Sequence, residues 1–352
     1  MKLLYVTSQS GRRINGFMRS AIMAARELNI DFTIVSNMNQ ADKEFYFLDC
    51  EMYGIKAEHI DCDRNPLAKK NYTVAKKQLL ELMNREKYDV VHCNTPIGGV
   101  LGRICAKEAG IPYVIYQAHG FHFWTGAPIK NWICYYPVER ILAHYTDILI
   151  TINDEDYMRA QKFHLKKGGR VVKVPGVGVD VAKFADVTKG YSEIRQKIRT
   201  KWNIPFDAVV FISVGELNFN KNHATAIKAF ANANIPNSFY LICGVGPLEE
   251  ELKRLSEKMG VEKHVKLLGF QANIPEILNA SDCFVFSSFR EGLPGALMEA
   301  MASGLPCIAS NIRGCKDLIQ DNEFLFDPND DRKLSDLMKK ILDAQKCSEQ
   351  LE

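Results

Sequence analysis

The sequence lacks any apolar run that approaches the roughly 20 residues of a membrane-spanning helix. Its ten cysteines include no Cys-x-x-Cys pair, which argues against a zinc site and against a disulfide framework. Several of them, such as Cys93 and Cys243, lie within apolar strand-like runs, and we interpret them as buried free thiols in a reducing compartment. The amino terminus has no long apolar region and is interpreted as a first strand and not as a leader. These absences predict a cytoplasmic protein.

The composition is that of an ordinary globular protein, with 47% apolar and 25% charged residues. A length of 352 residues favours two domains, because domains usually run to about 100–200 residues. The net charge of +3 is uneven: residues 1–184 carry 25 basic and 19 acidic side chains, whereas residues 185–352 carry 20 and 23. A mildly basic first half suits an anionic acceptor or peripheral contact with the inner membrane surface, and chance asymmetry accounts for it equally well.

Short apolar runs alternate with longer amphipathic stretches along the whole chain, which predicts βαβ units and parallel sheets. Strands are expected at 2–8, 31–37, 55–61, 89–94, 112–117, 147–153, 171–174, 209–215, 238–243, 265–269, 283–288, 306–310 and 323–327. Helical patterns fall at 16–29, 66–87, 97–109, 154–164, 222–233, 247–259, 273–279, 295–302 and 330–347.

A turn-rich run at 175–180 breaks this periodicity. The chain is therefore divided into a Rossmann-like domain at 1–175, a linker at 176–206, a second Rossmann-like domain at 207–335 and a C-terminal helix at 336–352. The predicted fold class is α/β, with two doubly wound parallel sheets facing a central cleft. Ligands of such sheets bind beyond the carboxyl ends of the strands, so candidate residues are sought there.

The most informative strand end follows residues 283–288. Glu291 lies in the loop after this strand, Pro294 suits the first turn of the next helix, and Glu299 lies inside that helix. The free amides and the positive dipole end of the helix attract an anion. An anion site with carboxylates beside it suits a nucleotide sugar, because its diphosphate is anionic and its sugar and ribose carry hydroxyl groups.

Two further strand ends carry residues that suit a nucleotide. Lys221 stands in the strand-to-helix turn after residues 209–215, where an ammonium group can bind a diphosphate. Gly244 and Gly246 form a turn after residues 238–243 that either approaches a nucleotide closely or is purely structural. This turn is not a dinucleotide fingerprint, because Gly-x-Gly-x-x-Gly fails at Glu249, and a dehydrogenase is accordingly a poor fit.

The string EGLPGALMEAMASGLPCIAS, which begins at Glu291, resembles the E-x7-E signature of retaining glycosyltransferases of family 4, which have the GT-B fold. Within that family the chain resembles bacterial enzymes that assemble capsule, exopolysaccharide or O-antigen repeats. The resemblance implies that Glu291 lies beside the transferred sugar and that Glu299 binds the ribose. The donor loop between them contains Gly292, Leu293 and Pro294.

The resemblance extends to the other strand ends. Lys221 matches a basic residue that holds the diphosphate in the family, whereas Glu216 stands at a donor position where arginine is usual, which puts a two-cation clamp in question. Gly244 and Gly246 match the family's Gly-x-Gly-Pro turn. His119 matches a histidine that points at the donor sugar. His122 is the second candidate, and a packed core histidine is the alternative for either.

On the acceptor side, Gly11 matches a glycine-bearing loop of the family, and Arg12 or Arg13 suits an acceptor phosphate as well as it suits a solvated loop. The run 125–140 is unusually aromatic, and together with Phe121, Phe123 and Trp124 it suits an apolar, weakly basic face toward a membrane or a polyprenyl carrier. A core helix with interfacial tyrosines is the interpretation that we favour.

The resemblance predicts retaining transfer of a hexose or N-acetylhexosamine from a nucleotide sugar, with UDP favoured, to a glycan or polyprenyl-diphosphate-linked acceptor. Glu291, Lys221 and His119 are the predicted catalytic residues. We expect no cofactor, no obligatory metal and no nucleic-acid partner. Two alternatives are open: a UDP-sugar epimerase of GT-B fold, and a catalytically silent nucleotide-sugar-binding partner of a polysaccharide assembly complex, which Glu216 favours.

Overall fold

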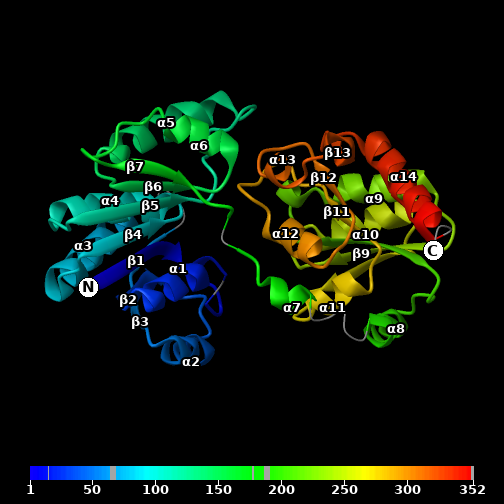
Figure 1. Ribbon diagram of the computed structural model, residues 1–352, viewed down its shortest axis with the longest axis horizontal. Helices are drawn as coiled ribbons and strands as arrows, with labels where there is room; N and C mark the ends of the chain where they lie inside the picture. Colours follow the sequence, from blue (N-terminus) through cyan, green and yellow to red (C-terminus); the bar gives the residue numbers. More distant parts are fainter. Residues whose placement is uncertain (15, 64–68, 177, 186–190, 350–352) are drawn as a thin grey trace. The chain divides into compact units, whose positions relative to one another are not determined.

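The computed structural model describes residues 1–14, 16–63, 69–176, 178–185 and 191–349, and the chain forms two compact units, Met1–Gly178 and Val179–Glu352 (Figure 1). Each unit is built around one parallel sheet. The stretch 176–206, predicted as a linker, contains two helices that belong to the second unit. In the described part of the chain, no helix is both long and apolar enough to cross a membrane.

The first unit has seven parallel strands in the order β3-β2-β1-β4-β5-β6-β7. They are β1 (Lys2–Gln9), β2 (Asp31–Asn37), β3 (Lys56–His59), β4 (Val90–Asn94), β5 (Tyr113–Ala118), β6 (Ile148–Thr151) and β7 (Arg170–Lys173). The strand order reverses between β1 and β4, which is the topological switch point where such sheets bind ligands. β1 and β4 are buried at almost every position because both faces of the sheet are covered there.

Helices cover both faces of this sheet (Figure 1). They are α1 (Gly16–Glu27), α2 (Lys43–Tyr53), α3 (Lys69–Glu86), α4 (Pro96–Glu108), α5 (Ile129–Ala143) and α6 (Asp154–Ala160). On one face, α1 and α2 pack on Tyr5 and Ile34. On the other face, α3 and α4 pack on Leu4 and Val91. The adjacent residues Leu4 and Tyr5 pack on opposite faces, because successive side chains of a strand point to opposite sides of the sheet.

The second unit has six parallel strands in the order β10-β9-β8-β11-β12-β13. They are β8 (Val209–Val214), β9 (Ser238–Cys243), β10 (Val265–Gly269), β11 (Cys283–Phe286), β12 (Cys307–Ser310) and β13 (Leu325–Phe326). The switch point lies between β8 and β11, so the loops after these two strands lie side by side.

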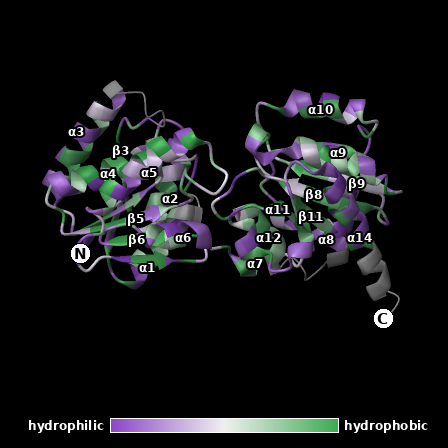
Figure 2. Cartoon of the chain, turned by 90° about the horizontal axis from the view of Figure 1, so that it is seen from above, coloured by the Kyte–Doolittle hydropathy of each residue, from purple (hydrophilic) through white to green (hydrophobic). Residues whose placement is uncertain are grey.

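The helices of the second unit are α7 (Val181–Ala185), α8 (Tyr191–Lys201), α9 (His223–Ala233), α10 (Glu249–Lys258), α11 (Ile274–Asn279), α12 (Gly295–Ala302), α13 (Cys315–Leu318) and α14 (Asp331–Glu349). One face of the sheet packs on α8, α11 and α12, and the other packs on α9, α10 and α14. Figure 2 shows α10 as largely hydrophilic, as expected of a helix that buries only one narrow stripe. A buried ion pair anchors α8, because Arg199 Nη2 lies 2.9 Å from Asp282 Oδ2.

Candidate functional site

The loops after β8 and β11 meet through a lysine and a glutamate. Lys221 ends a 3₁₀ turn, Phe219–Lys221, and Glu291 follows β11 by a short loop. Lys221 Nζ lies 2.7 Å from Glu291 Oε1, and the two side chains are only 23% and 18% exposed. Restricted solvent access strengthens the attraction between these charges relative to a pair in open water. The structure thus joins two residues that lie 70 positions apart in the sequence.

Hydrogen bonds to backbone carbonyl oxygens hold these two loops together. Asn220 Nδ2 donates to the Arg290 carbonyl oxygen at 2.9 Å, and the Phe289 amide donates to the Asn220 carbonyl oxygen at 2.8 Å. Ser287 Oγ donates to the Lys221 carbonyl oxygen at 3.0 Å. These bonds fix the positions from which Lys221 and Glu291 project, as a charged site requires.

The glycine turn after β9 packs on the turn after β8. A Cβ atom on Gly244 would lie 1.8 Å from the Gly215 carbonyl oxygen, and one on Gly246 would lie 2.4 Å from the Leu217 carbonyl oxygen. The Leu217 amide donates to the Val245 carbonyl oxygen at 3.0 Å. Only glycine permits this close backbone approach, so both glycines have a structural reason to be there.

Glu299 lies on α12, which begins at Gly295 with Pro294 as its N-cap. Its side chain is half-buried, and burial raises the pKa of its carboxyl group while Lys183 of α7 lowers it. A carboxylate that is costly to keep charged, and that faces few protein cations, is suited to accept hydrogen bonds from a ligand's hydroxyl groups.

The loop from Glu291 to Pro294, which contains Gly292 and Leu293, is held by the segment after β12. Arg313 Nε donates to the Glu291 carbonyl oxygen at 3.1 Å. Gly314 lies against the loop so closely that a Cβ atom there would be 2.3 Å from the Gly292 carbonyl oxygen. Sequence reasoning passed over Arg313, although it too follows the end of a buried strand.

Glu216 is exposed on the turn after β8. Its Oε2 accepts a hydrogen bond from Asn218 Nδ2 at 2.9 Å, and Asn218 Oδ1 accepts one from the Lys221 amide at 3.0 Å. Glu216 therefore belongs to the hydrogen-bonded turn that carries Lys221, and it adds a negative charge to that turn.

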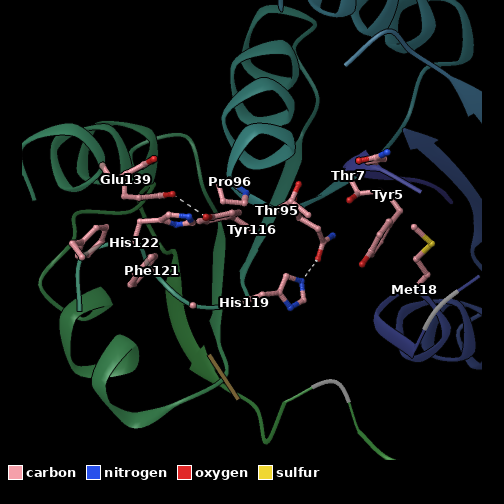
Figure 3. Close-up of a pocket in the computed structure, with 15 residues that line it drawn as sticks. Tyr5, Thr7, Met18, Thr95, Pro96, Tyr116, His119, Phe121, His122 and Glu139 are labelled. Carbon is pink, nitrogen blue, oxygen red and sulfur yellow. Dashed lines mark hydrogen bonds between the residues drawn. The ribbon is translucent and has the colours of Figure 1, made fainter. Parts of the chain in front are cut away.

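His119 lies at the carboxyl edge of the first unit's sheet, just after β5. Its Nε2 lies 3.0 Å from Oδ1 of the buried Asn94 at the end of β4 (Figure 3). Burial lowers the pKa of His119 to about 4, so the ring is neutral at neutral pH. Asn94 was not predicted, although it ends a strand that the sequence pattern places correctly.

A cavity of about 320 Å³ opens beside His119 at the ends of β1, β4 and β5, and His122 also lines it. At one side of the cavity, Glu139 of α5 accepts a hydrogen bond from the Tyr116 hydroxyl at 2.8 Å (Figure 3). Glu139 also accepts a hydrogen bond from Arg103 Nη2 at 2.8 Å. Arg103 is 1% exposed, so the buried carboxylate is compensated by a buried guanidinium. No local pattern could reveal this group, because its members come from three separate elements.

The aromatic run 125–140 and the phenylalanines before it have two different environments. Phe121 and Phe123 are buried, with ring centroids 4.7 Å apart, in the core that also receives α5. Ile129 and Ile133 on α5 are 74% and 68% exposed. The core-helix interpretation describes the aromatic side chains, and the exposed isoleucines form a separate apolar surface.

The loop after β1 places its two arginines differently. Arg13 pairs with Asp49 of α2. Arg12 is exposed, and its carbonyl oxygen accepts a hydrogen bond from the Asp42 amide at 3.1 Å. Gly11, also exposed, begins this turn. Both arginines are exposed, and the ion pair with Asp49 engages Arg13.

Two Asp-x-Asp triplets occur in the sequence, a pattern in which carboxylates can hold a divalent cation. In the first, Asp61 accepts from Gln78 and Asp63 accepts from Asn71. In the second triplet, at 154–156, Asp156 accepts a hydrogen bond from the Phe121 amide. Within the described ranges, no group of three or more His, Cys, Asp or Glu side chains is gathered as a metal site would require.

Both halves of the chain match known protein families. The family described as "Glycosyl transferase 4-like" matches residues 2–153, and the family described as "Glycosyl transferases group 1" matches residues 194–352. A relative in Bacillus subtilis (strain 168), named putative glycosyltransferase EpsD, is 41% identical over 264 residues, which is 74% of this chain and 68% of the relative. A relative in Escherichia coli, named UDP-Gal:alpha-D-GlcNAc-diphosphoundecaprenol alpha-1,3-galactosyltransferase, is 37% identical over 260 residues, which is 72% of this chain and 66% of the relative.

Solved structures share the fold. Anabaena Alr3699/HepE, solved in complex with UDP-glucose, superposes with a TM-score of 0.77 at 21% identity, over 98% of this chain and 91% of that one. WaaG, described as a glycosyltransferase involved in lipopolysaccharide biosynthesis, superposes with a TM-score of 0.72 at 15% identity, over 97% and 90%. At these identities the likeness establishes the fold class, two parallel-sheet α/β domains of GT-B type, and nothing finer.

Proposed function

Since this chain belongs to the family-4-like glycosyltransferases and is a glycosyltransferase of polysaccharide biosynthesis, we propose that it transfers a hexose or N-acetylhexosamine from a UDP-sugar with retention at the anomeric carbon. The acceptor is a glycan or a polyprenyl-diphosphate-linked sugar. The bond from the anomeric carbon to the diphosphate oxygen breaks, and a bond from that carbon to an acceptor hydroxyl oxygen forms. The hydroxyl proton leaves with the nucleoside diphosphate or enters solvent.

The observation that carries this proposal is the pairing of Lys221 with Glu291 at 2.7 Å beside a turn of closely packed glycines. A diphosphate displaces Glu291 from the ammonium group, and Lys221 then stabilises the negative charge that develops on the leaving group. Glu291 is released to the transferred sugar, and Glu299 accepts hydrogen bonds from the ribose. We assign no nucleophile.

UDP is favoured over GDP by two comparisons. The Escherichia coli relative carries UDP-Gal in its name, and the superposed Anabaena structure is a complex with UDP-glucose. The name of the same relative contains a diphosphoundecaprenol-linked acceptor, which supports a lipid-linked sugar as the acceptor here.

We further propose that the protein works in the cytoplasm at the membrane face. Three isoleucines of α5 are spaced by four and then eight positions. They are Ile129, Ile133 and Ile141, and they are 74%, 68% and 60% exposed. The helix also carries Lys130 and Arg140. An apolar stripe with basic neighbours is the pattern of a helix that lies on an anionic lipid surface.

The test is a calorimetric titration with UDP and GDP in the presence of EDTA, followed by a transfer assay. We expect UDP to bind without metal at micromolar affinity, and the product from a UDP-sugar to keep the donor's anomeric configuration by NMR. Epimer or free sugar formed without acceptor would instead identify an epimerase. UDP-sugar binding without turnover on a broad acceptor panel would identify a silent partner, and absence of all nucleotide binding would refute the donor site.

A further inference from the structure

Two phenylalanine rings stack at the carboxyl edge of the second unit's sheet, and we call them the phenylalanine platform. Phe219 lies in the turn after β8, and Phe289 lies in the loop after β11. Their ring centroids are 5.1 Å apart, and the ring planes differ by 24°. Phe219 is 78% exposed, whereas Phe289 is half-buried. Phe219 therefore rests on Phe289 with most of its own surface open to solvent.

The platform is held in place by the hydrogen bonds that join the two loops. The Phe289 amide donates to the Asn220 carbonyl oxygen at 2.8 Å. Asn218 Oδ1 accepts from the Lys221 amide at 3.0 Å, which closes the turn around Phe219. A phenylalanine side chain has few rotatable bonds, so it loses little conformational freedom when a ligand binds to it. A fixed aromatic ring of this kind is suited to anchor a ligand.

The platform stands beside the Lys221–Glu291 pair. Phe219 precedes Lys221 by two residues, and Phe289 precedes Glu291 by two residues. Among the described residues, the two hydrophobic clusters of this unit include neither ring. Packing of the core therefore gives no reason for an aromatic ring at position 219, whereas the neighbouring charged pair places the ring where substrates are expected.

The groups on this turn suit a sugar ring. The face of an aromatic ring is electron-rich and attracts C–H groups that carry a slight positive charge. A hexopyranose presents such C–H groups on one face and hydroxyl groups around its edge. Glu216, on the same turn as Phe219, is exposed, and among the described side chains only Asn218 donates to its carboxylate. A carboxylate oxygen has more than one acceptor position, so Glu216 has capacity for a sugar hydroxyl.

We infer that the phenylalanine platform binds a hexopyranose ring of the acceptor, with the apolar face of the sugar on Phe219 and a sugar hydroxyl on Glu216. The inference rests on the proposed function, which gives the diphosphate to Lys221 and the transferred sugar to Glu291. The acceptor is then the sugar that remains for the platform. Glu216, which stands where arginine is usual in the family, thereby serves the acceptor and not the diphosphate.

The first test is saturation-transfer NMR on the full chain saturated with UDP, with methyl β-N-acetylglucosaminide as the probe. In the wild type, we expect the strongest saturation at the axial protons that share one face of this sugar. In Phe219→Ala their saturation should fall by at least about threefold, because the aromatic face is gone. Phe219→Trp keeps an aromatic face and should retain the signal. Phe206→Ala is the matched control, since Phe206 is 59% exposed and lies just before β8, at the opposite edge of the sheet.

A transfer assay with octyl β-N-acetylglucosaminide and the UDP-sugar that the wild type uses gives the second test. The KM for the octyl glycoside should rise about five- to tenfold in Phe219→Ala, the usual size of an aromatic contact. It should rise about tenfold in Glu216→Ala, which loses a hydrogen bond to a charged group. The dissociation constant of UDP should be unchanged in both variants.

Four results would overturn the inference. The first is no saturation of the methyl glycoside in the wild type, and the second is equal saturation in Phe219→Ala. The third is weaker UDP binding in Phe219→Ala, which would assign the platform to the nucleotide base. The fourth is binding of geranyl phosphate that is lost in Phe219→Ala while the sugar signal stays, which would assign the platform to a prenyl chain. If the wild type binds no UDP, the proposed function itself fails, whereas normal UDP binding with an unaffected acceptor removes only the inference.

Discussion

Lys221 Nζ lies 2.7 Å from Glu291 Oε1, across the switch point between β8 and β11. Without nucleotide, each group is the other's counter-charge. Under the proposed function, both groups change partners when an anionic diphosphate and a sugar bind. The free energy of the Lys221–Glu291 interaction would then reduce the affinity for the donor, because the pair has to be broken first.

The first prediction follows from this exchange of partners. Lys221→Ala should weaken UDP binding by about 1.5–3 kcal/mol, the usual effect of losing a charged hydrogen bond. Glu291→Gln should leave UDP binding equal or tighter, because the competitor for the ammonium group is gone, and should abolish transfer. Calorimetry with UDP and an assay with UDP-sugar measure the two effects. UDP binding lost equally in both variants would contradict the exchange.

The second prediction concerns the glycine turn. Gly244→Ala should lower the free energy of unfolding by about 3 kcal/mol and weaken UDP binding, because a Cβ atom 1.8 Å from the Gly215 carbonyl oxygen forces the backbone to move. Gly260→Ala is the matched control, since its φ of +71° is also unfavourable to alanine while nothing lies within 4 Å. The control should lose only about 1 kcal/mol and bind UDP normally. If urea unfolding gives the same decrease in the free energy of unfolding for both variants, the contact between Gly244 and Gly215 is not tight.

The third prediction separates function from stability at Glu299. Burial raises the pKa of its carboxyl group, so the folded protein keeps this carboxylate charged at a cost. Glu299→Gln should therefore raise the free energy of unfolding at pH 7.5 and weaken UDP binding about tenfold. Glu251→Gln on the exposed side of α10 should change neither quantity. Unchanged UDP affinity in Glu299→Gln would remove Glu299 from the nucleotide site.

The fourth prediction is acid destabilisation through buried histidines. Burial lowers the pKa of His92, His119 and His223 to about 4, from an ordinary value of 6.5. Between these pH values the three imidazoles are protonated in the unfolded chain but stay neutral in the folded protein. The free energy of unfolding therefore decreases as pH falls from about 6.5 towards 4. At pH 5 the buried His92 and His223 each account for a loss of about 2 kcal/mol, and His119, which is partly exposed, accounts for less.

Urea unfolding at pH 7.5 and pH 5.0 measures this effect. The difference between the two pH values should shrink by about 2 kcal/mol in His223→Gln. It should be unchanged in His164→Asn, whose side chain is exposed. If His223→Gln lowers the free energy of unfolding equally at both pH values, the substitution has only disturbed packing. That result would contradict the proposed titration of His223.

The strand pattern was predictable almost residue by residue. Buried parallel strands such as β4 and β9 are continuous apolar runs, and the turn chemistry at their ends is local, so the expected runs at 89–94 and 238–243 correspond to these strands. The helix α2 was missed. Its apolar side chains Phe45, Phe47, Leu48 and Met52 are about half-exposed or more, so they do not form the one-sided stripe by which a helix is recognised.

The candidate site was predictable only as separate pieces. Glu291, Glu299, Lys221 and the two glycines each follow a predicted strand, and the resemblance to a family supplied their roles. Their roles in catalysis and donor binding stay predictions. Asn94 and Arg313 also follow strands, yet nothing local distinguishes them from other polar residues in loops.

By itself, then, the sequence determined the alternation of strands and helices, the family and the positions that sit at strand ends, because each depends on local periodicity and turn chemistry. Only the tertiary structure decided which of those positions touch. The strand order joins β8 to β11, and this non-local pairing brings Lys221 to Glu291 and Phe219 to Phe289. Such contacts form across tens of residues and depend on how the sheet is assembled, which no short window of sequence contains.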